Sequence, residues 1–97
     1  MATIRTTSVF DSWYSKLRDR QAKARIAVRI DRLANGNPGQ CRALAGDVNE
    51  MKVDVGPGYR VYYTERSGEV IVLLVGGDKS RQSADIAKAK EIARNLE

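Results

Sequence analysis

The chain has 97 residues and a formal net charge of +5, from seventeen Lys and Arg against twelve Asp and Glu. This length suits one hydrophobic core, so we expect a single domain over residues 1–97. The longest apolar run, residues 70–75, is far too short to span a bilayer, and no signal peptide opens the chain. We therefore expect a cytoplasmic protein.

The residue types that are missing exclude several kinds of site. The chain has no histidine, which removes Ser-His-Asp and Cys-His catalysis in their usual forms. Cys41 is the one cysteine, so neither an intramolecular disulfide nor the usual Cys/His zinc sites can form. We expect no metal and no other cofactor, and proton transfer must use Lys, Arg, Tyr, Asp or Glu.

The positive charge is concentrated near the N-terminus. Residues 1–35 hold eight Lys and Arg against three Asp and Glu, whereas residues 36–97 hold nine of each kind. This asymmetry favours an acidic or polyanionic partner. A charged helix face is about as often simply solvated, so both interpretations stay open.

A short strand and a helix are predicted first. Residues 2–7 alternate small, β-branched and charged side chains, as an edge strand does. Ser8 and Asp11 then have the spacing of a capping box. An apolar stripe at helical spacing predicts a helix over residues 8–20, formed by Phe10, Trp13, Tyr14 and Leu17.

A second helix follows almost directly and ends at Asn35-Gly36, a C-cap pair. Its apolar stripe consists of Ala22, Ile26, Ile30 and Leu33. Residues 8–35 are thus predicted to form a helical hairpin, and residues 37–46 a loop.

From residue 50 the apolar period changes to two, which predicts three sequential antiparallel strands. The first holds Met51, Val53 and Val55, and Gly56-Pro57-Gly58 turns the chain into the second, residues 59–64. The third, residues 70–75, is apolar throughout, which predicts a central strand covered on both faces.

The glycines at 76 and 77 are expected to break the third strand, and Ser80 or Ser83 to cap a final helix. The buried stripe of this helix is predicted as Ile86, Ala89, Ile92, Ala93 and Leu96. The order is βααβββα. The fold class is α+β, with the helical hairpin and C-terminal helix packed on a small, mainly antiparallel sheet.

The same alternation defines a candidate site. If Met51, Val53, Tyr59 and Val61 face the helices, Lys52, Arg60 and Tyr62 share the opposite face. Further polar residues follow the third strand and can reach this face: Lys79, Arg81 and Gln82. Cations beside a phenol suit the binding of a phosphodiester.

RNA carries its own nucleophile, the 2′-OH, so an enzyme that cuts it must align this group, move two protons and stabilise charge on the phosphate. Arg60 can bind the phosphate through its planar fork, and Lys52 and Lys79 are candidates for proton transfer. Each residue also has a purely structural interpretation. Lys52 and Arg60 can form cross-strand ion pairs, and Tyr62 suits an exposed strand position.

One combination of motifs is more specific. It consists of residues 56–63 (Gly-Pro-Gly-Tyr-Arg-Val-Tyr-Tyr), the apolar strand, residues 76–79 (Gly-Gly-Asp-Lys), and then Gln82, Asp85 and Ile86. With Phe10-x-x-Trp13 and residues 29–37, it resembles the RelE/ParE toxin superfamily, in particular its HigB-like branch of phage-derived, Gp49-like addiction-module killer proteins. The resemblance spans essentially the whole chain.

The resemblance implies a RelE-like fold and the toxin of a type II toxin-antitoxin system. Such a toxin enters the 30S A site of the ribosome and cuts mRNA without a metal, which stops translation and growth. It is held inactive in a hetero-oligomer with an antitoxin, commonly a helix-turn-helix protein. The implied catalytic residues are Lys52, Arg60 and Lys79. Arg81 and Gln82, which lie close to Lys79 in the sequence, are the candidates for binding RNA.

Two departures from the superfamily pattern are visible. Asp54 stands where RelE-type members often place a lysine, and Asp85 lies nearest the point where they carry a base-stacking tyrosine. Tyr62 is the substitute proposed for that role. Two other functions stay open: ParE-like inhibition of DNA gyrase without nuclease activity, and a catalytically inactive co-repressor that binds the antitoxin.

Overall fold

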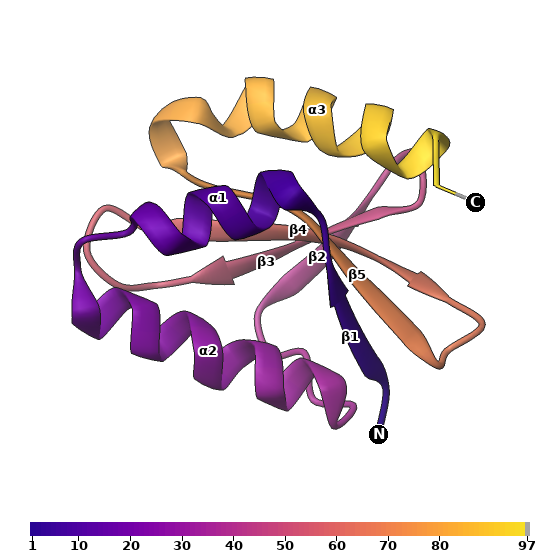
Figure 1. Ribbon diagram of the computed structural model, residues 1–97, viewed down its shortest axis with the longest axis horizontal. Helices are drawn as coiled ribbons and strands as arrows, with labels where there is room; N and C mark the ends of the chain where they lie inside the picture. Colours follow the sequence, from indigo (N-terminus) through magenta and orange to yellow (C-terminus); the bar gives the residue numbers. More distant parts are fainter. Residues whose placement is uncertain (97) are drawn as a thin grey trace.

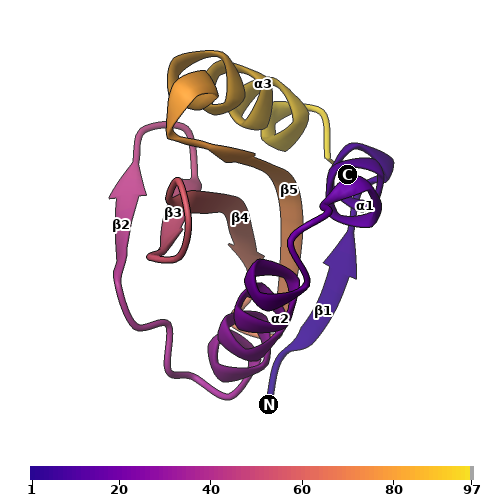
Figure 2. The ribbon, with the colours of Figure 1, turned by 90° about the vertical axis from the view of Figure 1, so that its left-hand side faces the viewer.

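The computed structural model describes residues 1–96 and shows a curved sheet with helices on both faces (Figures 1 and 2). The predicted fold class is confirmed. In chain order the elements are β1 (Thr3–Thr6), α1 (Ser8–Lys16), α2 (Arg20–Ala34), β2 (Cys41–Leu44), β3 (Val48–Val53), β4 (Tyr59–Arg66), β5 (Val70–Asp78), a short 3-10 helix η1 (Lys79–Arg81) and α3 (Gln82–Arg94).

The five strands lie in the order β1-β5-β4-β3-β2. β1 runs parallel to β5, and the other three pairings are antiparallel. β4 is therefore the middle strand, and β5, predicted as central, lies between β4 and the edge strand β1. The loop predicted over residues 37–46 is wrong in part, because β2 lies within it. Its residues 41–43 are exposed and carry no apolar alternation, so only pairing with β3 defines the strand.

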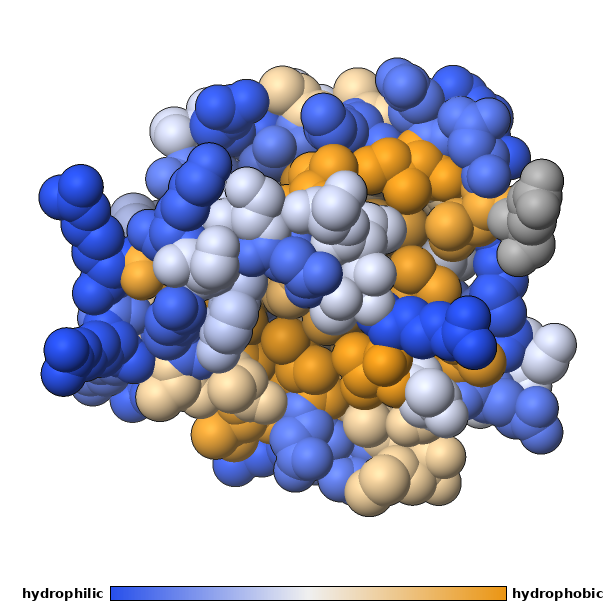
Figure 3. All heavy atoms as spheres, viewed as in Figure 1, coloured by the Kyte–Doolittle hydropathy of each residue, from blue (hydrophilic) through white to orange (hydrophobic). Residues whose placement is uncertain are grey.

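Alternation along the strands builds two cores. On one face α1 and α2 cover the sheet, and on the other α3 does (Figure 2). The side chains from β3 and β4 that were predicted to face the helical hairpin do so: Met51, Val53, Tyr59, Val61 and Tyr63. The second core, beneath α3, includes Val48, Tyr62, Leu74 and Ala89. Apolar side chains reach the surface along the seams between the helices, bordered by hydrophilic ones (Figure 3).

The helix ends differ from prediction in detail. Thr7 rather than Ser8 caps α1, accepting a 3.0 Å hydrogen bond from the Phe10 amide. α1 ends at Lys16, and Asp19 caps α2 by accepting from the amide of Ala22 at 3.1 Å. The predicted Ser80 and Ser83 caps are wrong: α3 begins at Gln82, its N-cap is Arg81, and no side chain in the described part of the chain caps it.

The predicted strand break at Gly76 and Gly77 is also wrong, because β5 continues to Asp78 and both glycines pair with β4. Glycine is needed there for space. A Cβ on Gly76 would overlap the Trp13 ring, and one on Gly77 would overlap the carboxylate of Asp85. α1 and α3 therefore rest directly on the backbone of β5, from opposite faces.

We expect Gly77→Ala to lower the free energy of unfolding by about 1–3 kcal/mol, because the new methyl group displaces the buried Asp85 side chain. Adding Asp85→Ala removes the obstructing carboxylate and should recover most of this loss. Chemical denaturation of both variants measures the difference. An additive effect of the two substitutions would contradict the proposed packing.

Candidate functional site

A pocket of about 440 Å³ opens where β2, β3 and β4 meet the start of α3. Strand pairing builds it, since β3–β4 register sets Lys52 opposite Arg60 and β2–β3 register sets Arg42 opposite Glu50. The seven lining residues are Gln40, Cys41, Arg42, Glu50, Lys52, Arg60 and Gln82. Three of the residues predicted from sequence, Lys52, Arg60 and Gln82, thus share one pocket.

Arg60 is the buried cation of this pocket. The residue is only 7% exposed, yet within residues 1–96 the one hydrogen bond of its side chain runs from Nη1 to the Gly58 carbonyl at 3.4 Å. Its Nε lies 3.8 Å from Glu50 Oε2 and has no hydrogen-bond partner in that part of the chain. A buried charge with unused donors costs stability unless a ligand fills them. The arrangement therefore suits the binding of an anion.

Glu50 supplies the negative charge beside Arg60, and the sequence interpretation did not select it. It is 5% exposed, and its two carboxylate oxygens accept 2.8 Å hydrogen bonds from Arg42 Nε and Gln82 Nε2. Burial acts to raise the pKa of Glu50, but the hydrogen bonds from Arg42 and Gln82 outweigh it and hold the pKa below its usual value. The carboxylate is therefore ionised at neutral pH.

Lys52 is half-buried at the mouth of the pocket, and its backbone is fixed from the other face. The Arg29 guanidinium donates to the Lys52 carbonyl at 2.8 Å and to the Pro38 carbonyl at 3.0 Å. Lys79 and Arg81 lie outside the pocket. Both are exposed on the turn formed by η1, where they line an adjacent hollow that also includes Gln82.

Tyr62 requires a correction, because it was predicted to lie on an exposed RNA-facing patch. It does share a sheet face with Lys52 and Arg60, but α3 covers that face at this point and Tyr62 is 0% exposed. Burial, and after it the charge of Glu50, raises the pKa of Tyr62 well above its usual range. Tyr62 is a core residue, so the described structure gives RNA no access to its ring.

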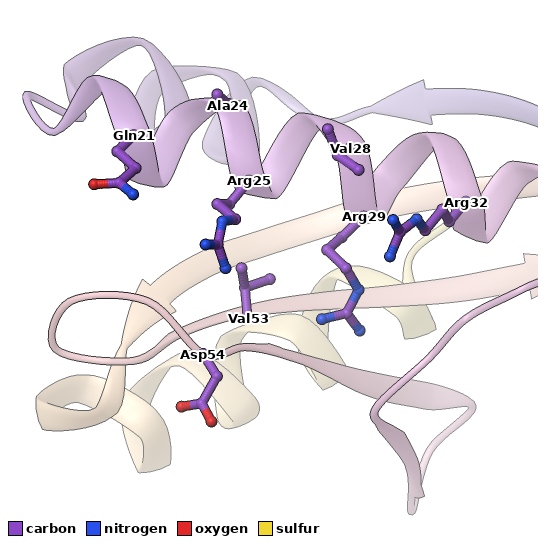
Figure 4. Close-up of a pocket in the computed structure, with 8 residues that line it drawn as sticks. All are labelled: Gln21, Ala24, Arg25, Val28, Arg29, Arg32, Val53 and Asp54. Atoms are coloured by element: carbon purple, nitrogen blue, oxygen red, sulfur yellow. The ribbon is translucent and has the colours of Figure 1, made fainter.

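A second hollow, of about 550 Å³, lies between α2 and the end of β3 (Figure 4). Arg25 and Arg29 point from α2 towards β3, and Arg32 lines the same hollow. Arg29 is held by backbone carbonyls, whereas no ion pair within residues 1–96 engages Arg25 or Arg32. The N-terminal excess of positive charge is thus presented partly here, away from the Arg60 pocket.

Among residues 1–96, no group of three or more His, Cys, Asp or Glu side chains is arranged to hold a metal ion. In the same range, no helix is both long enough and apolar enough to cross a membrane.

The chain resembles known proteins in sequence and in fold. An uncharacterized protein of Haemophilus influenzae is 47% identical over 93 residues, which are 96% of this chain and 94% of that protein. The E. coli toxin RelE, solved in the free state as a double mutant, superposes with a TM-score of 0.76 at 18% identity, covering 99% of this chain and all of RelE. HP0894, a conserved hypothetical protein of Helicobacter pylori, superposes with a TM-score of 0.51 at 18% identity, covering 82% of this chain and 97% of HP0894.

The RelE-like fold agrees with the superfamily predicted from the Gly-Tyr-Arg strand. Residues 13–97 match the family described as phage-derived protein Gp49-like (DUF891). The match covers most of the chain. This protein is therefore a member of the Gp49-like family, with the fold of the RelE toxin superfamily.

Proposed function

We propose that this protein is the toxin of a type II toxin-antitoxin system and acts as a ribosome-dependent mRNA endoribonuclease. One observation carries the proposal: Arg60 is buried in an open pocket beside Lys52 and Gln82, and its Nε has no partner among residues 1–96. A guanidinium with unused donors matches the oxygens of a phosphodiester. The Gp49-like family and the RelE fold support the same assignment.

The proposed reaction is attack by the ribose 2′-oxygen on the adjacent phosphorus, with cleavage of the bond to the 5′-oxygen. The 2′-OH proton passes to a base and the leaving 5′-oxygen takes a proton from an acid, so the products are a 2′,3′-cyclic phosphate and a 5′-hydroxyl. Arg60 holds the phosphate and stabilises its developing charge. Lys52, opposite Arg60 in register, and Lys79, on η1, carry the protons, and Arg81 and Gln82 bind neighbouring RNA.

The partners of this function are a cognate antitoxin, of the helix-turn-helix kind, and the 30S A site with its mRNA. Free RNA would reach the open pocket in many orientations, whereas the ribosome holds one codon in place, which supplies the alignment that in-line attack needs. Arg25 and Arg32 lie on α2, outside the Arg60 pocket, and they can contact ribosomal RNA while mRNA occupies the pocket.

Inducing the wild-type chain is expected to stop growth and to produce mRNA breaks that depend on translation. Arg60→Ala and Lys79→Ala should each reduce cleavage by about 100-fold or more, because each removes a group that stabilises or protonates the transition state. Mapping RNA 5′ ends after induction measures this. Arg5→Ala, at an exposed position of β1, is the matched control and should cut normally.

Two other results would each contradict the nuclease, and a third would contradict the role of Arg60. Growth arrest with intact mRNA and damaged DNA would indicate the gyrase inhibitor. No arrest in a host without the antitoxin would indicate the inactive co-repressor. Full activity of a folded Arg60→Ala protein, its fold checked by thermal unfolding, would remove Arg60 from the mechanism.

Ribosome binding should weaken steeply as salt rises, since Lys and Arg side chains that bind phosphates release counterions. The double variant Arg25→Glu/Arg32→Glu should flatten the plot of log affinity against log salt by roughly 0.7–0.9 for each phosphate that is no longer neutralised. Sedimentation with 30S subunits measures the affinity, and Arg5→Glu serves as the control for a single charge reversal outside this face. An unchanged slope in the double variant would show that this face of α2 does not bind ribosomal RNA.

A further inference from the structure

Glu50 occupies the junction of three elements. It lies on β3, pairs with Arg42 of β2, and accepts a hydrogen bond from Gln82, the first residue of α3. On its other side, across the strand register, stands Tyr62 of β4. A buried carboxylate at such a junction fixes the relative positions of the groups that it contacts.

Glu50 and Arg60 interact through their charges and not through a hydrogen bond. Oε1 of Glu50 accepts from Arg42, and Oε2 accepts from Gln82 while lying 3.8 Å from Arg60 Nε. At that separation the opposite charges attract, but no hydrogen bond forms. Glu50 thus compensates the buried charge of Arg60 without occupying its donors.

Charge compensation is necessary at this point because the pocket is otherwise basic. Arg42, Lys52 and Arg60 line it together, and Glu50 is the one acidic residue among its seven lining residues. Without a negative charge the guanidinium of Arg60, 9% exposed as a side chain, would lie in a desolvated site beside two other cations. The favoured response would be for Arg60 to swing out towards water.

We propose that Glu50 is a positioning residue: its carboxylate keeps Arg60 drawn into the pocket with the Nε donor unoccupied, and through Gln82 it sets the start of α3 beside this donor. The role rests on the proposed function, since Arg60 is the group that would bind the RNA phosphate. Glu50 itself does not exchange protons with the substrate. Its low pKa, caused by Arg42 and Gln82 against the opposing effect of burial, agrees with a fixed anion.

The first test observes Arg60 without any cleavage. The ¹⁵N–¹H signal of its Nε–Hε group, assigned by its loss in Arg60→Lys, should exchange slowly with water in the wild type and shift when inorganic phosphate is added. In Glu50→Gln, which keeps size and loses charge, exchange should be about tenfold faster, because one charged interaction of Arg60 is removed. Glu50→Asp keeps the charge and should restore most of the protection.

The second test uses ribosome-dependent cleavage of mRNA. Glu50→Gln should reduce kcat by about 100-fold with KM unchanged or lower, because a displaced Arg60 no longer meets the reacting phosphate while the pocket becomes more positive. A residue that only stabilises the fold would change kcat and KM in parallel with the thermal unfolding temperature. The matched comparison is Arg42→Ala, which removes the hydrogen-bond partner on the outer side of Glu50.

The outcomes separate the two proposals. Arg60 signals identical in wild type and Glu50→Gln would overturn the positioning role, whatever the chain cleaves. An equal kcat in a folded Glu50→Gln protein would overturn it too. If the wild type cuts no RNA but the Arg60 signal still depends on Glu50 and responds to phosphate, the nuclease fails and Glu50 keeps its role in an anion site.

Discussion

The burial of one arginine organises the candidate site. Arg60 lies on the middle strand of the sheet, and pairing with β3 and β5 leaves its side chain on the face that α3 covers. Burying a guanidinium costs free energy that a counter-charge offsets, and Glu50 provides this charge from the neighbouring strand. The same carboxylate draws Arg42 and Gln82 to the pocket, so three elements meet at the point where an anion would bind.

The sheet face that α3 covers is open at the Arg60 pocket and closed beneath the rest of the helix. α3 packs over Tyr62, Leu74 and Val75, which excludes water from the deep part of the face. Its first turn comes close to the sheet because Gly77 has no side chain, so Asp85 lies directly on the β5 backbone and Gln82 reaches Glu50. On the opposite face Arg29 of α2 holds the Lys52 carbonyl. The backbone of Lys52 is thus held by α2, from the face opposite the pocket.

Local patterns in the sequence were sufficient for four of the five strands and for part of the site. Period-two alternation placed Lys52 and Arg60 on one face, because strand register follows from the apolar positions. The same rule placed Tyr62 there correctly but could not indicate its burial, which depends on where a helix twenty residues later crosses the sheet. The edge strand β2 had no pattern of its own. Gly76 and Gly77 were misinterpreted as a break because the close approach of Trp13 and Asp85 is a tertiary contact.

Glu50 shows the limit of the sequence interpretation most clearly. It lies two residues before Lys52 on the same strand, so alternation alone put the two side chains on one face, but a Glu beside Lys on a strand is usually only a surface pair. Its importance appears when β2, β4 and α3 are assembled around it. The chemistry of a histidine-free site therefore depends on a residue whose role is defined by tertiary structure.

The most direct test of the proposed chemistry is cleavage of a defined mRNA in a reconstituted translation system, with a single 2′-deoxynucleotide placed at the mapped cut site in the A-site codon. The account predicts that the all-ribose mRNA is cut to a 2′,3′-cyclic phosphate and a 5′-hydroxyl, and that the single 2′-deoxy substitution abolishes the cut. Cleavage that persists at the substituted position would contradict attack by the 2′-oxygen, and an uncut all-ribose mRNA would contradict the nuclease itself.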